Sequence, residues 1–349
     1  MLRFILCCTP LLVAQFAAAQ ESYTLDEKTD TWVLTNVPEP GSPEAQLAVA
    51  AKELAEGDYQ EAIKLSSIWM VRHKRHPLLG EAHIIHGDAL FEQRYFYESL
   101  FDYEIVARDF YGTQAEIIAN ERELQIATMF AHGLKRLNFG FRMSDATDEA
   151  EELFIRIQER LPDSPLAETA ALELADLYYR KQKMKLANDM YQIFIENFPT
   201  SPFIERARAR LIYTRLATYR GPAFNSVGLD DARKELVQLQ YISPRLATAV
   251  NSDGLITRID ESLSQKMLHT AKWYLRVNNP IAAEYTVRRL LETHENTTAA
   301  IEAMEDLVPK IMPQLPPVIL SEIGDFYEIY REHILGSTQT FIDTMESNP

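Results

Sequence analysis

Apolar residues recur with helical spacing along the chain from about residue 44 onward, and strand-like alternation is almost absent. The repeat is clearest in the segments Leu161-Pro-Asp-Ser-Pro165 and Phe198-Pro-Thr-Ser-Pro202, whose first residues lie 37 positions apart. Each segment precedes an Ala-rich helical stretch, at 166–179 and 203–216. A repeat of this length is typical of stacked helical hairpins that bury their apolar faces against one another. The pattern therefore predicts an all-α helical-hairpin solenoid.

Pairs of small residues twelve positions apart support this prediction. Each pair straddles a predicted turn, so that one member lies on each of two antiparallel helices. Helix axes that approach to about 8–10 Å leave room only for small side chains at the point of contact. The pairs are Ala50/Ala62, Gly87/Ser99, Ala175/Ala187 and Ala271/Ala283.

The predicted solenoid covers residues 44–308 and contains about six helical pairs. The pairs are 44–56 with 59–75, 79–93 with 95–110, 114–137 with 145–160, 165–181 with 184–197, 202–219 with 229–240, and 259–277 with 280–294. Irregular segments are expected at 138–144, 221–228 and 244–257, and one more helix at 298–308. The remainder, 309–349, is predicted to be a Pro-rich break followed by a helix at about 319–335.

The first nineteen residues have the layout of a secretory signal. A short positive start is followed by an apolar run at 4–13 and by Ala17–Ala19, a small-residue cleavage site. The apolar run is too short to span a bilayer. Both cysteines, Cys7 and Cys8, lie in this segment, and Leu6 stands where a lipid-attachment site needs a small residue. We therefore expect export across the inner membrane, no lipid anchor, no cysteine chemistry, and an extended leader at 20–43.

The chain is strongly acidic, with a formal net charge of −16. This balance disfavours nucleic acid and anionic membrane surfaces as partners. Two basic clusters, 72–75 and 205–210, are interpreted as solvated helix faces, the second with Arg206 and Arg210 on one face.

The segment from Leu161 to Leu216, with Ala175-Asp-Leu-Tyr-Tyr179 between its two Pro-rich turns, resembles the tetratricopeptide repeats of BamD-like proteins. A second segment, from Ala271-Lys-Trp-Tyr274 to Thr297, resembles the late repeat of that family. The resemblance spans roughly 45–308. It implies a tetratricopeptide-like solenoid and a periplasmic role in the assembly of outer-membrane β-barrel proteins.

Three features depart from the BamD-like pattern. The lipid-anchor cysteine of the family is missing, the repeats are interrupted near 138–144 and 221–228, and the tail after Pro309 has no counterpart. The resemblance thus implies a related architecture more firmly than an identical task.

The histidines are the one cluster that suggests chemistry. His73, His76, His83 and His86 lie within fourteen residues, and the last two share a helix face, as metal ligands would. In the repeat register, however, His86 faces the core and His83 is partly exposed. Phosphate-binding loops, nucleophile elbows and calcium loops are absent from the sequence. The interpretation is therefore a protein that is not an enzyme and has no cofactor.

Function then depends on surfaces. The first helices of stacked pairs line a face that binds extended or helical peptides. We expect six positions to be exposed on that face and to form a peptide-binding groove for aromatic segments of basic or neutral character. They are Ile84, Asp88, Phe91, Leu172, Asp176 and Tyr179.

The leading hypothesis is an exported, non-enzymatic scaffold at the periplasmic face of the outer membrane. It would bind envelope proteins or extended peptides, among them an outer-membrane barrel-assembly protein. One alternative is a periplasmic adaptor that coordinates cell-wall synthesis. A second, from a different class, is a metal-binding protein built around the histidines.

Overall fold

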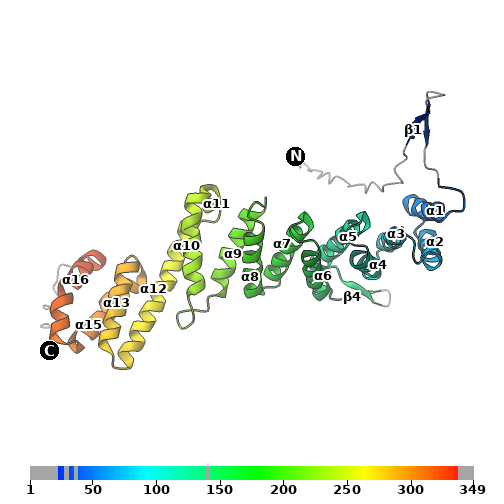
Figure 1. Ribbon diagram of the computed structural model, residues 1–349. Helices are drawn as coiled ribbons and strands as arrows, with labels where there is room; N and C mark the ends of the chain where they lie inside the picture. Colours follow the sequence, from blue (N-terminus) through cyan, green and yellow to red (C-terminus); the bar gives the residue numbers. More distant parts are fainter. Residues whose placement is uncertain (1–22, 27–30, 35–37, 139–140, 337–349) are drawn as a thin grey trace, which may run out of the picture. The chain divides into compact units, whose positions relative to one another are not determined.

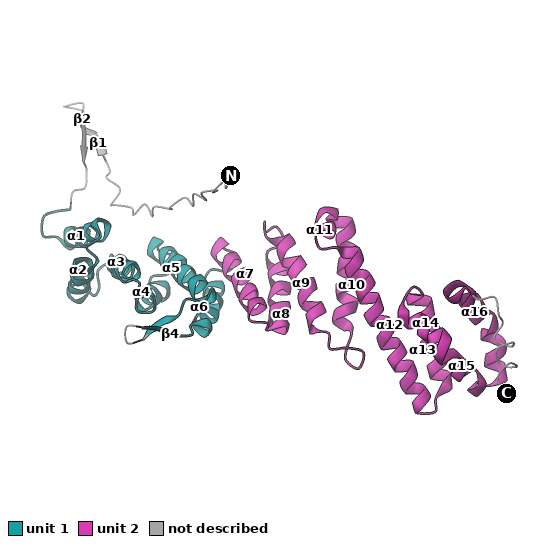
Figure 2. Cartoon of the chain, turned by 180° about the vertical axis from the view of Figure 1, so that it is seen from behind, with its two compact units in different colours: residues 1–162 teal, residues 163–349 magenta. Residues whose placement is uncertain are grey.

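The computed structural model describes residues 23–26, 31–34, 38–138 and 141–336. The predicted secretory signal at 1–19 lies outside these residues. The chain divides into two compact units, Met1–Pro162 and Asp163–Pro349 (Figure 2).

Unit 1 is built from three antiparallel helical pairs (Figure 1). Each helix packs on the next, and the first helix of each pair also contacts the first helix of the following pair. The helices are α1 (Pro43–Glu56), α2 (Tyr59–Arg72), α3 (Leu79–Glu92), α4 (Phe96–Asp109), α5 (Gln114–Ala131) and α6 (Thr147–Arg160).

Unit 2 continues the same pattern of helical pairs and ends in short helical segments before a final long helix. Its elements are α7 (Pro165–Arg180), α8 (Met184–Asn197), α9 (Ile204–Thr218), α10 (Val227–Ile242), α11 (Pro244–Ala249), α12 (Ser252–Arg276), α13 (Pro280–His294), α14 (Thr298–Glu302), the π-helix η1 (Ala303–Leu307), α15 (Val308–Ile311), the 3₁₀-helix η2 (Met312–Gln314) and α16 (Pro317–Leu335). The predicted all-α, tetratricopeptide-like solenoid fold is confirmed.

Several helices begin with a capping side chain followed by proline. Ser42, Ser164 and Asn279 each accept a hydrogen bond at 3.1 Å from the backbone N–H three residues later. The proline that follows each of them needs no hydrogen-bond acceptor at this position, and its fixed φ suits the first helical turn. The serine- and asparagine-proline pairs in the sequence thus fix where these helices begin.

The eight small residues of the predicted pairs are all buried. At Gly87 on α3, an added Cβ would lie 2.8 Å from Cε1 of the Tyr103 ring on α4. The burial of all eight residues and the tight contact at Gly87 agree with the prediction that small side chains lie where paired helices pack.

Short strands appear at two places where the sequence suggested none. The predicted helix 114–137 ends at Ala131, because Gly133 adopts a left-handed φ of 99° and turns the chain away. The chain then forms β3 (Arg136–Asn138) and β4 (Phe141–Ser144), which pair antiparallel. The predicted extended leader likewise contains β1 (Tyr23–Asp26) and β2 (Thr31–Leu34), also antiparallel.

Helix also replaces two predicted irregular segments. Residues 244–257 form α11 and the start of α12, so α12 begins at Ser252 rather than near 259. The predicted break at Pro309 does not interrupt the helical path, because the π-helix at 303–307 precedes it and accommodates the missing N–H. The path ends instead at η2, before α16.

In the described part of the chain, no helix combines the length and apolar character needed to cross a bilayer.

A buried ionic network joins the last three helices of unit 1. The Glu123 side chain on α5 is fully buried and accepts a 2.8 Å hydrogen bond from Arg160 on α6. Arg160 also donates to Glu104 on α4, at 2.6 Å. Burial raises the pKa of Glu123 to about 7, although the nearby Arg160 opposes the shift.

Replacing Gly87 with alanine should destabilise the protein by about 1–3 kcal/mol, because the new methyl group would meet the Tyr103 ring. Gly324→Ala is the matched control, since a Cβ there has no neighbour within 4 Å and the substitution favours helix by up to about 1 kcal/mol. Urea unfolding followed by circular dichroism measures both changes. Equal effects at the two glycines would contradict the close packing of α3 on α4.

The raised pKa of Glu123 predicts a pH-dependent stability. Its folded pKa of about 7 exceeds the ordinary 4.5, so its contribution is full below pH 4.5 and is lost as the pH rises through 7. A shift of this size corresponds to about 3 kcal/mol. The Glu123→Gln variant has no titrating group at this position. The difference in free energy of unfolding between variant and parent should therefore change by about 3 kcal/mol as the pH rises from 4.5 through 7. Parallel pH profiles from urea unfolding would refute the assignment.

Candidate functional site

Four of the six residues expected to be exposed on a peptide-binding face are buried. Ile84, Asp88, Leu172 and Asp176 are only 3–5% exposed. The other two, Phe91 and Tyr179, are half-buried.

The expectation of exposure was wrong for a physical reason. The helices that carry these residues, α3 and α7, pack against the second helix of their own pair, and α3 also contacts the first helices on either side. The polar positions on these helices therefore face other helices and need partners there.

In unit 1, Asp88 is the centre of a cluster that joins three helices. The Tyr103 hydroxyl on α4 donates to Oδ1 of Asp88 at 2.7 Å. Nε of Arg122 on α5 donates to the same oxygen at 2.9 Å, and the Arg122 guanidinium lies 5.5 Å from the centre of the Phe91 ring. A buried carboxylate is thus matched by a phenol and a guanidinium from two neighbouring helices.

Unit 2 repeats this cluster at the same spacing. Asp176 on α7 accepts a 2.5 Å hydrogen bond from the Tyr191 hydroxyl on α8 and pairs with Arg210 on α9. Tyrosine and arginine follow aspartate by 15 and 34 residues in both units. Tyr179, three residues after Asp176, lies 5.4 Å from the Arg210 guanidinium, as Phe91 lies near its arginine. We call these two clusters the Asp–Tyr–Arg clamps.

The tyrosines of the clamps act as hydrogen-bond donors. Burial raises the pKa of both Tyr103 and Tyr191, and the neighbouring aspartate raises it further, so each phenol keeps its proton.

The second clamp differs from the first in its charge. Arg206 also reaches Asp176, so one carboxylate there faces two guanidiniums. Arg206 and Arg210 were interpreted as part of a solvated face. They lie on one face of α9, but that face meets the buried Asp176.

The four histidines are held by ring packing and by two carboxylates, Asp102 and Glu44, the second of which lies 3.1 Å from Nε2 of His76. Nδ1 of His83 and Nδ1 of His86 lie 2.7 and 2.6 Å from the two oxygens of Asp102 on α4. Burial would raise the pKa of Asp102, but the hydrogen bonds with both imidazoles lower it overall below its usual value. The other two rings, His73 and His76, pack beside the Trp69 ring. Among the described residues, no group of three or more potential ligands is arranged to hold a metal ion.

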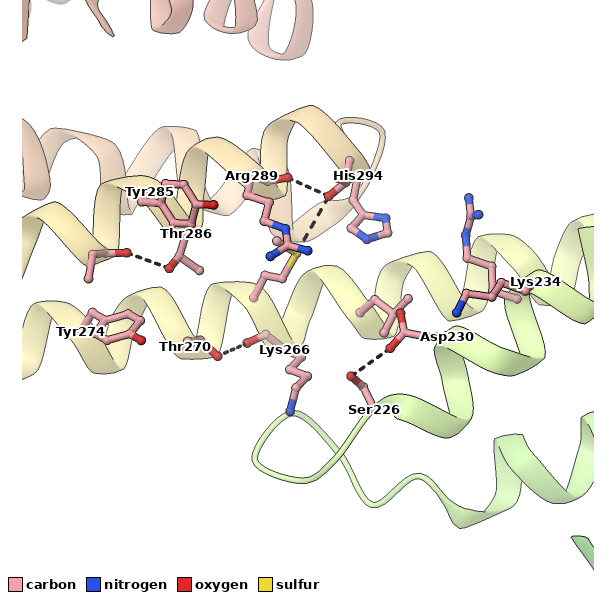
Figure 3. A pocket seen from close by; sticks show the side chains of 15 residues that line it. Ser226, Asp230, Lys234, Lys266, Thr270, Tyr274, Tyr285, Thr286, Arg289 and His294 are labelled. Atoms are coloured by element: carbon pink, nitrogen blue, oxygen red, sulfur yellow. Dashed lines mark hydrogen bonds between the residues drawn. The ribbon is translucent and has the colours of Figure 1, made fainter. Parts of the chain in front are cut away.

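A separate groove lies in unit 2 between the start of α10 and the antiparallel pair α12–α13 (Figure 3). Its volume is about 760 Å³. Tyr274 and Tyr285 lie together at one end, whereas Asp230, Lys234 and His294 lie toward the other (Figure 3). The lining residues are Ser226, Asp230, Arg233, Lys234, Leu263, Lys266, Met267, Thr270, Tyr274, Ala282, Tyr285, Thr286, Arg289, Thr293 and His294.

The groove is basic in a protein that is acidic as a whole. It is lined by four lysine and arginine side chains and by one carboxylate. Arg233 is bound to Asp260 through two hydrogen bonds, at 2.6 and 3.2 Å, and Lys266 donates to the backbone oxygen of Phe224. The Arg289 guanidinium is exposed and has no side-chain partner among the described residues.

His294 adds no positive charge to the groove at neutral pH. Its ring is nearly buried, and burial lowers its pKa, an effect that the nearby Asp260 opposes. The cationic side chains of the groove are therefore its arginines and lysines, of which Arg233 pairs with Asp260 and Lys234 lies 3.7 Å from Asp231.

Sequence reasoning missed this groove. One wall comes from the α12–α13 pair and the other from α10, and the sequence does not show that these helices face one another. The clamps, by contrast, had a signal that could have found them, because the offsets of 15 and 34 residues recur in two units.

The comparisons with known proteins identify the family. No curated protein matches the chain. The family model of YfiO, described as an outer membrane lipoprotein, matches residues 127–311, which is more than half of the chain. The matched region contains the clamp of unit 2 and the whole groove, whereas the clamp of unit 1 precedes it. The chain therefore belongs to the YfiO family of outer membrane lipoproteins, the BamD family that its repeats resemble.

Proposed function

We propose that this protein is a non-enzymatic scaffold at the periplasmic face of the outer membrane, where it takes part in assembling β-barrel proteins. The observation that carries the proposal is the family match over 127–311, together with the resemblance of the repeats to BamD-like proteins. The predicted secretory signal at 1–19 agrees with this location.

The distribution of polar side chains favours a scaffold over an enzyme. The buried carboxylates of the clamps are bound by tyrosine and arginine, and Asp102 is bound by two histidines. These groups stabilise helix packing and are not free for acid–base chemistry. The protein is therefore expected to act through surfaces that bind a partner.

Two surfaces are candidates for contact with an envelope protein. The first is the accessible part of each clamp, since Phe91 in unit 1 and Tyr179 in unit 2 are half-buried and the clamp arginines are partly exposed. The second is the groove, whose cations suit an extended segment that carries carboxylates, and whose tyrosines suit apolar or aromatic side chains. This partner chemistry differs from the basic or neutral peptide expected from sequence.

The proposal predicts a specific partner in the native host. A chain tagged in the leader after Gln20 should, after gentle cross-linking, recover a barrel-assembly protein of the envelope at near-stoichiometric yield. Arg289→Ala should lower the yield about fivefold if the groove makes the contact, because one exposed ion pair is worth up to about 1 kcal/mol. Arg276→Ala, also an exposed arginine of the α12–α13 pair but outside the groove, is the control.

The identity of the recovered proteins decides between the functions. Cell-wall synthesis enzymes in place of barrel-assembly proteins would contradict the proposal and favour the adaptor alternative. An Arg289→Ala yield equal to that of the parent would exclude Arg289 from the contact and leave the accessible parts of the two clamps as the candidates.

A further inference from the structure

We propose that the groove binds the chain's own segment 337–349, which follows α16. The proposal concerns the chain alone, and only its regulatory consequence rests on the proposed scaffold function.

The first argument is where the described chain ends. Nε2 of His333, near the end of α16, lies 3.8 Å from Oε2 of Glu295. Glu295 directly follows His294, a lining residue of the groove. The helix ends at Leu335, and Gly336 takes a left-handed φ of 62°, which turns the chain out of the helical path. The described chain therefore ends close to the end of α13 that carries His294.

The second argument is reach. Arg289 precedes His294 by five residues of α13, a distance of about 7.5 Å along the helix. Asp343 follows Gly336 by seven residues, which span up to about 23 Å when extended. The length of this segment thus exceeds the distance along α13 that separates His294 from Arg289.

The third argument is complementary chemistry. Segment 337–349 contains Asp343 and Glu346 and has no lysine or arginine. Beside these acids it carries Phe341, Ile342 and Met345. The groove offers the matching groups, since its lining includes four lysine and arginine side chains together with Tyr274, Tyr285 and Met267.

In this arrangement, segment 337–349 competes for the groove with an acidic segment of a partner protein. An envelope protein that presents a similar segment would have to displace residues 337–349 before it binds. A tethered competitor has a high effective concentration, so weak contacts suffice to keep the groove filled until a partner arrives.

The test uses the full mature chain, which has no cysteine after residue 8. Thr344→Cys is combined with Thr293→Cys in the groove, both are spin-labelled, and the distance between labels is measured by pulsed electron resonance. A matched pair combines Thr344→Cys with Thr257→Cys, an exposed threonine of α12 outside the groove. We expect a narrow, short distance for the groove pair and a broad, longer one for the control pair.

A charge reversal then tests the groove itself. Arg289→Glu should lower the short-distance fraction about threefold to fivefold, whereas Arg276→Glu should leave it unchanged. Identical broad distributions for both label pairs would overturn the proposal and leave the groove to a separate acidic partner. Equal effects of the two reversals would also overturn it, because the contact would then not involve Arg289.

This measurement needs no partner protein. A failure to recover a barrel-assembly protein, which would contradict the scaffold function, therefore leaves the result of the spin-label test intact.

Discussion

A buried carboxylate that needs partners is the constraint on which much of this fold depends. Asp88 and Asp176 lie on the first helix of a pair, and their side chains are nearly inaccessible. An unpaired charge in such a position would be strongly destabilising. The partners come from the second helix of the same pair and the first helix of the next, so each aspartate joins three helices. Apolar packing brings the helices together, and the clamps select the arrangement in which the charges are matched.

The spacing of the clamps connects this interaction to the repeat. An arginine 34 residues after the aspartate lies one tetratricopeptide-sized unit further along the chain. The tyrosine at 15 residues lies across the turn, on the antiparallel helix. In unit 1 the α4–α5–α6 network of Glu104, Glu123 and Arg160 serves a similar purpose with different residues. Buried ion pairs between successive helices thus recur along the repeats.

Local periodicity explains what the sequence could predict. Helix pairs and their turns follow from apolar spacing and from small residues such as Ala175 and Ala187, and the structure has both residues fully buried. Exposure of Asp88 and Asp176 was predicted wrongly, because the face formed by the first helices of the pairs was assumed to be open at these positions. The β3–β4 hairpin was missed because it depends on tertiary contacts such as Arg136 over the Tyr97 ring. The groove was missed because α10 and the predicted α12–α13 pair belong to different repeats and meet only in three dimensions.

The most direct test of this account measures whether one clamp holds three helices together. Hydrogen–deuterium exchange of Asp176→Asn should show faster amide exchange in α7, α8 and α9 together, because Tyr191 and Arg210 lose their common partner. Asp189→Asn, at an exposed position of α8, should leave exchange unchanged. Faster exchange confined to α7, or a pattern equal to that of the control, would contradict the claim that the clamp couples successive repeats.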